Sequence, residues 1–233
     1  MTHPFTLSPM EQEALLLSLK VSVCAVAGSL PAGILSAWVL ARLRFPGKNL
    51  LDGVIHLPLV MPPVVTGYLL LMTLGIKGPI GAFLYETFGI RLAFNWKGAA
   101  VAAAVMAFPL MVRAVRLSFE NVDQGLEAAA RTLGAGPVRV FFTVTLPLAV
   151  PGILTGSILS FAKSLGEFGA TITFVSNIQG QTQTLPLALY TLTQLPNGEV
   201  GALRLCILAV LVSMAALVLS GKIGGRFDAH LRG

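Results

Sequence analysis

The sequence contains little charge. Only 11% of its residues are Asp, Glu, Lys or Arg, whereas about a quarter is usual in soluble domains. Hydrophobic residues make up 55%, and the mean hydropathy is +0.81. This composition excludes an ordinary soluble globular protein and is typical of an integral membrane protein. The 233 residues suffice for about five or six crossings of ~20 residues each, so we expect a single domain, 1–233, without a sizeable extramembrane part.

Cysteine is scarce, and recognisable enzymatic motifs are absent. Cys24 and Cys206 lie inside apolar runs without a CxxC spacing or nearby metal ligands, so we expect packing thiols, no disulfide and no metal site. The phosphate-binding motif G-x-x-x-x-G-K-[ST] is missing, because Gly47-Lys48 is followed by Asn49. The apolar runs hold no Ser/His/Asp grouping or carboxylate cluster, which argues against an intramembrane enzyme. We therefore expect no catalytic residue and no cofactor, and any ATP must be hydrolysed by another chain.

Long apolar runs account for most of the sequence. Five have about the length of a membrane crossing, and they cover 14–41, 51–75, 98–117, 146–162 and 203–221. A shorter run at 185–195 has about half that length and is predicted to be a re-entrant or interfacial helix. The first run is too long for a cleaved signal peptide and no basic segment precedes it, so we expect a retained helix. The predicted fold class is an all-α integral membrane protein with about five transmembrane helices.

The basic residues predict the orientation, because cationic loops resist translocation. Ten Lys and Arg residues lie after the first, third and fifth runs or near the ends of these runs. They are Arg42, Arg44, Lys48, Arg113, Arg116, Arg131, Arg139, Lys222, Arg226 and Arg232. The opposite side receives an acidic N-terminus and a connection with fewer cations: Glu11, Glu13, Lys77, Arg91 and Lys97. We therefore expect the N-terminus outside, the C-terminus in the cytoplasm and residues 120–146 as a cytoplasmic loop. The cations form no cluster with interleaved aromatics, so the net charge of +6 predicts topology and no nucleic-acid partner.

The segment EAAARTLGAGPVRVFFTVTLPLAVPG, at 127–152, is amphipathic and helix-prone, although a plain connector needs only a few residues. Its alanines, Ala128–Ala130, form a smooth face that another surface can approach closely. Gly134 and Gly136 suit a left-handed or sharply turned backbone at the helix end. We expect Leu146-Pro147 to start the next helix, since Pro fits a first turn. From these features alone, an ordinary surface helix and a docking helix are both open.

The spacing in this segment resembles the EAA loop of binding-protein-dependent ABC importer permeases. The pattern is A-A-x-x-x-G, nine residues, an aliphatic residue, one residue and Leu-Pro, carried by Ala129, Ala130, Gly134, Val144, Leu146 and Pro147. The resemblance implies a coupling helix that docks into a cleft of a partner ATPase. Aligned on Gly134, the position expected to hold Glu is Ala128, and the carboxylate stands one residue earlier as Glu127. The partner of Glu127 is therefore open.

Three further blocks resemble the molybdate permease subunit of this family. They are FPGKNLLDGVIHLPLVMPPVVTGYLLL (45–71), MAFPLMVRAVRLSFENVD (106–123) and SLGEFGATITFVSNI (164–178), and the resemblance extends over about 11–221. It implies a type I importer fold, a permease homodimer, two copies of an ABC ATPase, an external molybdate-binding protein and a location in the cytoplasmic membrane of a prokaryote. Sulfate or tungstate permeases are the alternatives within the family.

An alternative from another class is a stand-alone channel or ion-driven carrier. A carrier built from inverted repeats usually has matching halves, and the five unequal runs lack them. Co-purification of an ATPase would separate the two classes.

Bends and charges inside the runs are candidates for the transport path. Pro58, Pro62 and Pro63, together with Gly67, should bend the second run, because proline removes a backbone donor. The bend serves either a cavity or packing. Lys163 and Glu167, followed by Phe168, are costly in a membrane unless paired, hydrated or facing a cavity. A self-neutralising structural pair and a place at the gate are both open, and the resemblance favours the gate.

Other features of the runs predict packing and weak anion binding. His56 stands alone in the second run, where hydrogen-bonded packing is a more common role than proton relay. Gly152 and Gly156 permit close helix approach, which we expect to be internal to the chain. Apart from Lys163, the central parts of the runs contain no Lys or Arg. A tightly held dianion needs several convergent donors, so only a weak oxyanion site is expected along the path.

Overall fold

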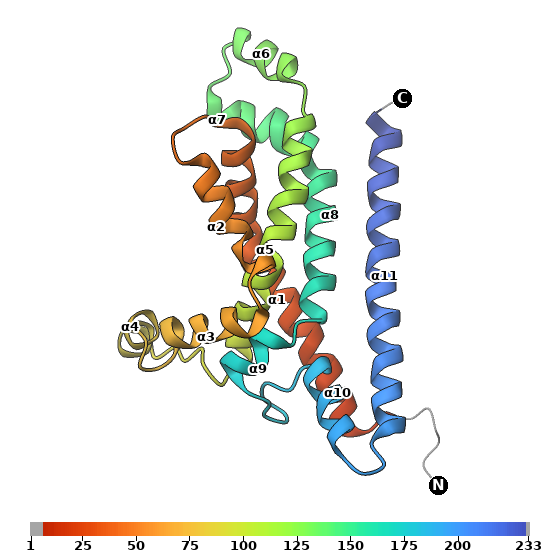
Figure 1. The fold of residues 1–233 in the computed structure, drawn as a ribbon. Coiled ribbons are helices and arrows are strands. Elements are labelled where there is room, and N and C mark those ends of the chain that lie inside the picture. Colours follow the sequence, from red (N-terminus) through yellow and green to blue (C-terminus); the bar gives the residue numbers. More distant parts are fainter. Residues whose placement is uncertain (1–6, 232–233) are drawn as a thin grey trace.

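The computed structural model describes residues 7–231, and side chains as far as residue 219 (Figure 1). Its helices are α1 (Pro9–Arg42), α2 (Lys48–Val60), α3 (Pro63–Leu74), α4 (Pro79–Phe88), α5 (Trp96–Asn121), α6 (Gln124–Thr132), α7 (Pro137–Val140), the π-helical turn η1 (Phe141–Thr145), α8 (Leu146–Leu165), α9 (Gly169–Val175), α10 (Leu185–Gln194) and α11 (Glu199–Leu231). Within residues 7–231 there is no strand, which confirms the all-α prediction. Arg232 and the side chains of Lys222 and Arg226 lie outside the described part.

Four helical segments are long and apolar enough to cross a membrane. They are α1, α5, the continuous segment Pro137–Leu165 and the first 21 residues of α11. A fifth span exists if α2 and α3 count as one, but their axes differ by 113°. The break follows Met61, where Pro62 and Pro63 supply no backbone N–H to continue the ladder. The predicted bend is confirmed at Pro62 and Pro63, whereas Pro58 lies inside α2 without a break. The run at 51–75 is no straight crossing.

Helix α5 forms the centre of the bundle, between α1 and α8. Small residues make this close packing feasible, and Ala99, Ala102 and Ala103 are almost completely buried. A Cβ added to Gly152 of α8 would meet the Ser118 side chain of α5 at 2.2 Å. Gly152 therefore packs inside the chain, as predicted.

The cysteines differ from the prediction. Cys24 and Cys206 are free thiols, but both are exposed on the helix surfaces instead of packed in the core. Apolar runs that cross a membrane are often apolar on every side, so an apolar sequence context does not distinguish a core position from a lipid-facing one.

The two ends of the bundle are structurally distinct (Figure 1). Helix α6 lies at one end, which we call the α6 end; α1 finishes, α2 starts and α5 finishes close to it, and α11 also finishes there. Helices α9 and α10 lie at the opposite end, where α1 and α11 begin. There, Glu11 is 1% exposed and its Oε1 accepts from Arg204 Nη2 at 2.9 Å. This ion pair joins the first and last long helices.

Candidate functional sites at the two ends of the bundle

Helix α6 is a short, capped helix that stands outside the bundle. The Asp123 side chain accepts a hydrogen bond from Gly125 N at 2.8 Å and so caps its first turn. Gly134 follows the helix with φ +86°, which is the left-handed backbone that the sequence predicted, whereas Gly136 is extended with φ −68° and does not follow that prediction. In this conformation Ala135 N reaches the Ala130 carbonyl at 3.1 Å. Local sequence therefore determines where α6 begins and ends.

The outer surface of α6 is small and apolar. Ala128 and Ala129 are exposed, whereas Ala130 is half-buried. Leu133 is 89% exposed, and Leu126 is half exposed. Exposed apolar side chains grouped on one surface are typical of a contact site for another protein. We call this surface, Leu126, Ala129 and Leu133, the docking face; Ala128 is exposed on another side of α6, where it lines a cavity with Glu127 and Arg42.

Glu127 points the other way, into the protein. Its Oε1 atom accepts hydrogen bonds from Arg42 Nη2 at 2.9 Å and from Thr145 Oγ1 at 2.8 Å. Arg42 also donates to the Val122 carbonyl at 3.1 Å, and Arg131 Nη2 lies 4.0 Å from the second carboxylate oxygen of Glu127. The partner left open by the sequence is therefore the end of α1, and Glu127 ties α6 to the bundle.

Helix α8 begins at Leu146 with Pro147 in its first turn, as predicted, but the chain before it is already helical. The helical segment already begins at Pro137 and continues through η1 into α8. Pro147 lacks the N–H that an α-helix would need at this point, and the turn before it widens to a π-helix in which Leu146 N bonds to the Phe141 carbonyl. The π turn also places Thr145 where its hydroxyl reaches Glu127.

Lys163 and Glu167 form the predicted pair near the opposite end. Lys163 Nζ lies 3.2 Å from Glu167 Oε2, and Glu167 Oε1 accepts from Ala170 N at 3.0 Å. The Glu167 side chain is 2% exposed, whereas that of Lys163 is 34% exposed. Glu167 thus neutralises a lysine and caps α9. The Phe168 ring lies 5.4 Å from the Tyr190 ring of α10.

The structure brings this pair next to the prolines of the second run. A Cβ added to Gly169 would lie 2.7 Å from Pro63 Cβ, and one added to Gly67 would lie 2.6 Å from the Ala170 carbonyl oxygen. Helix α3 therefore packs backbone to backbone on α9, and the bend at Pro62 is held against the segment that follows Glu167. Two segments distant in sequence, each a candidate for the transport path, are therefore in contact.

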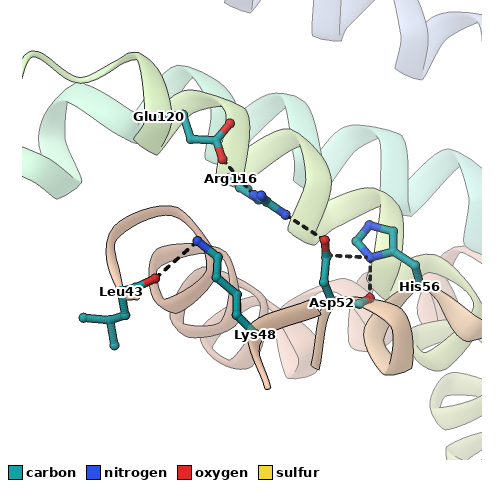
Figure 2. Close-up of polar contacts among 6 residues, drawn as sticks. All are labelled: Leu43, Lys48, Asp52, His56, Arg116 and Glu120. Atoms are coloured by element: carbon teal, nitrogen blue, oxygen red, sulfur yellow. Dashed lines mark hydrogen bonds and ion pairs between the residues drawn. The ribbon is translucent and has the colours of Figure 1, made fainter. Parts of the chain in front are cut away.

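The sequence interpretation missed a cluster between α2 and α5 at the α6 end (Figure 2). Arg116 binds two carboxylates, with Nη1 3.1 Å from Asp52 Oδ2 and Nε 2.8 Å from Glu120 Oε1. His56 Nδ1 lies 2.9 Å from the Asp52 carbonyl oxygen and 3.1 Å from Asp52 Oδ1. His56 is hydrogen-bonded, as predicted, but it does not stand alone, because it lies beside the Asp52 carboxylate. Lys48 lies nearby and donates to the Leu43 carbonyl at 3.2 Å.

A helical spacing could have revealed this cluster. Asp52 and His56 are four residues apart, as are Arg116 and Glu120, so each pair lies on one face of its helix. The sequence predicts that the run at 98–117 ends just after Arg113 and Arg116, whereas α5 continues to Asn121. Arg113 and Arg116 consequently lie within the helix, one to two turns before its end.

Comparison with known proteins identifies the family. The model of the binding-protein-dependent transport system inner membrane component matches residues 29–227. The molybdenum transport system permease protein ModB of Escherichia coli K12 is 64% identical over 214 residues, covering 92% of this chain and 93% of the relative. The sulfate transport system permease protein CysT of Salmonella typhimurium is 37% identical over 201 residues, covering 85% and 72%.

Solved structures agree on the fold. An amino acid ABC transporter crystallised with histidines matches with a TM-score of 0.65 at 20% identity, and the match covers 94% of both chains. A bacterial ABC transporter that imports alginate matches with a TM-score of 0.72 at 16% identity, covering 94% of this chain and 80% of the other. With its helical bundle, broken second span and external α6, this chain belongs to the family of binding-protein-dependent transport system inner membrane components.

Proposed function

We propose that this chain is the transmembrane subunit of an ATP-driven importer that carries molybdate into the cytoplasm of a prokaryote. The observation that carries the proposal is the 64% identity to a molybdenum transport permease along almost the whole chain. Sulfate is the second candidate substrate, because a sulfate permease is 37% identical. The lower identity makes sulfate the weaker of the two, and tungstate, another tetrahedral oxyanion, is a third.

The energy source is an ABC ATPase, two copies of which dock at the α6 end. The docking face is the surface for one of them, since Ala129 has no bulky side chain and Leu133 is largely exposed, and the small side chain of Ala128 leaves the adjoining side of α6 approachable. Glu127 transmits the movement, because its buried bonds join α6 to α1 and η1. Gly134 supplies the left-handed turn after α6. Leu146 and Pro147 support the transmission through the π turn that presents Thr145.

The transport path runs between two copies of the chain. Helix α2 supports this arrangement, because Ile55 is its one buried residue in the single chain and Leu50 and Val60 are 73% and 83% exposed. The gate lies near the opposite end, where the bend at Pro62 and Pro63 packs on Gly169, directly after Lys163, Glu167 and Phe168. A bent helix packed on a broken one can change its angle without unfolding a span, which suits alternating access.

Orientation and the external partner follow from the same arrangement. The α6 end is cytoplasmic, which leaves the N-terminus and the α9–α10 end outside. The external molybdate-binding protein delivers its ligand at the α9–α10 end. The loop between α9 and α10 suits a docking platform there, because Gln183 Nε2 donates to Asn177 Oδ1 at 3.0 Å and Asn177 Nδ2 to Thr191 Oγ1 at 2.8 Å. Such internal bonds keep a loop in one conformation.

The experiment is uptake of radiolabelled molybdate into vesicles that contain the purified permease with its co-purifying ATPase. Uptake should require ATP and the external binding protein together. Faster uptake of sulfate or tungstate at equal concentrations would reassign the substrate. Uptake by the permease alone, without an ATPase, would instead establish a channel or an ion-driven carrier.

A further inference from the structure

Five ionisable side chains gather between α2 and α5 at the α6 end. With Leu117 they line a cavity of about 340 Å³, and they are Asp52, His56, Arg113, Arg116 and Glu120. Figure 2 shows the Arg116 guanidinium between the carboxylates of Glu120 and Asp52, with the His56 ring beside Asp52. The residues come from two helices. Asp52 of α2 and Arg116 of α5, which are in contact, lie 64 positions apart in the sequence.

This cluster extends some way into the bundle. Arg113 lies eight residues before the end of α5 at Asn121, and His56 lies eight residues after the start of α2 at Lys48. Eight residues of helix span about 12 Å along the axis. Ionisable groups at this depth are costly when they face hydrocarbon, and in membrane proteins they line water-filled cavities or the bundle interior.

Helix surfaces that suit contact with lipid differ from this cluster in composition. The exposed side chains of α11 between residues 205 and 219 are apolar or cysteine, including Ile207, Leu211 and Met214. The side chains of Arg116, Asp52 and Glu120 are 27%, 35% and 40% exposed in the single chain. The α2–α5 cavity is therefore polar where the surface of α11 is apolar, and we infer that it holds water.

The charged side chains in the cavity differ in the number of ion pairs they make. Arg116 is held by both carboxylates, whereas Arg113 is exposed and makes no ion pair within the described residues. His56 directs Nδ1 toward Asp52, which leaves Nε2 outside that contact. The cavity thus presents a guanidinium with uncommitted N–H donors, the group that best matches a tetrahedral oxyanion. Asp52 and Glu120 repel an anion and keep its binding weak.

We propose that this cavity is the exit station of the transport path, where the oxyanion binds Arg113 transiently before it enters the cytoplasm. Arg113 contacts the anion, and Arg116 is a positioning residue that holds α2 and α5 together through Asp52 and Glu120. Weak binding serves the purpose, because an ion in a path must leave as readily as it arrives. This proposal rests on the proposed function. It assigns a transport role to residues that lie far from the gate at Lys163 and Glu167.

The first test compares Arg113→Gln with Arg44→Gln in the complete permease–ATPase complex with the external binding protein. Arg44 is an exposed cation of the α1–α2 connection at the same end, outside the cavity, and is the matched control. Radiolabelled molybdate uptake should fall roughly tenfold for Arg113→Gln, the effect of losing one charge-assisted hydrogen bond, and should stay normal for Arg44→Gln. ATP hydrolysis stimulated by the binding protein should continue, so fewer ions enter per ATP. Arg113→Lys should restore part of the uptake.

The second test measures whether the cavity is wet and accessible to an anion. Leu117→Cys is made with Cys24 and Cys206 replaced by Ser, and a membrane-impermeant anionic thiol reagent is added on the ATPase side. Leu117→Cys should react, and millimolar molybdate should slow the reaction more than chloride at equal ionic strength. Leu211→Cys, on the apolar surface of α11, should not react. Failure of Leu117→Cys to react, or equal rates in both salts, would overturn the exit station.

The outcomes separate this site from the proposed function. Wild-type vesicles that accumulate no molybdate would overturn the proposed substrate and the site with it. Normal wild-type uptake, together with equal uptake by Arg113→Gln and Arg44→Gln, would overturn the exit station and leave the importer in place.

Discussion

Glu127 of α6 and Arg42 of α1 are joined by an ion pair of 2.9 Å, although 85 residues separate them. Each side chain is 11% exposed, and Thr145 adds a third helical element to the contact. An external helix attached to the bundle through one buried carboxylate is well placed to transmit a push from a docked partner. Its position depends on a few polar contacts that point mutations can remove.

Replacing Glu127 with Ala should uncouple the importer. Removing one member of a buried ion pair costs about 3–5 kcal/mol, because the other charge is left unpaired. We expect a lower melting temperature of the permease–ATPase complex and loss of ATPase stimulation by the binding protein. The double change Arg42→Met with Glu127→Leu removes both charges and should destabilise less than Glu127→Ala alone. A Glu127→Ala complex with normal stimulation would show that the pair does not position α6.

Gly134 and Gly136 should respond differently to the same substitution. Neither has an atom within 4 Å of an added Cβ, but Gly134 has φ +86° and Gly136 has φ −68°. A left-handed backbone costs a side chain about 1–2 kcal/mol, so Gly134→Val should reduce molybdate uptake several-fold while Gly136→Val retains it. Gly134→Asn should be intermediate, since Asn tolerates this conformation. Equal losses at both glycines would indicate that the docking surface rejects any side chain there.

Ala129→Asp should separate folding from assembly. Ala129 is exposed on α6, so an aspartate there stays hydrated in the free permease and should leave its melting temperature unchanged. Burial of an unpaired carboxylate against a docked ATPase costs several kcal/mol. Co-purification of the ATPase should therefore be lost. Retention of the ATPase with normal transport would exclude Ala129 from the contact surface.

The Lys163–Glu167 pair predicts a non-additive mutant cycle. Lys163→Ala leaves the Glu167 carboxylate, 2% exposed, with the Ala170 amide but no cation. Adding Glu167→Gln removes the charge and keeps an acceptor for that amide, so the double variant should transport better than Lys163→Ala alone. The measurement is molybdate uptake at matched membrane abundance. Additive losses would favour separate roles, such as direct contact of Lys163 with the anion.

Topology is tested by reporter fusions at three positions. A reporter at the N-terminus or within residues 77–97 should be active only outside the cell, and one within residues 120–145 only in the cytoplasm. This expectation follows from the retention of Arg and Lys on the cytoplasmic side. A cytoplasmic N-terminus would invert the bundle and place α6 away from any cytoplasmic ATPase.

Much of the fold could be predicted because its causes are local. Apolar runs of sufficient length predict helices in a bilayer, since every backbone group must find a partner within its own segment. Proline at positions 62 and 63 predicts a break, and Gly134 predicts a left-handed turn, because these residues restrict or free their own backbone. The resemblance of the EAA segment and of three further blocks indicated the family, which the comparisons confirm.

Other features depend on residues that meet only after the helices pack. The sequence by itself determined the apolar spans, the break after Met61 and the small-residue surface of α6. Only the tertiary structure decided that Glu127 turns inward to Arg42, that a π turn absorbs Pro147, and that Asp52 pairs with Arg116. The physical reason is that helix periodicity assigns each residue to a face, whereas the rotation and depth at which two helices pack decide which faces meet.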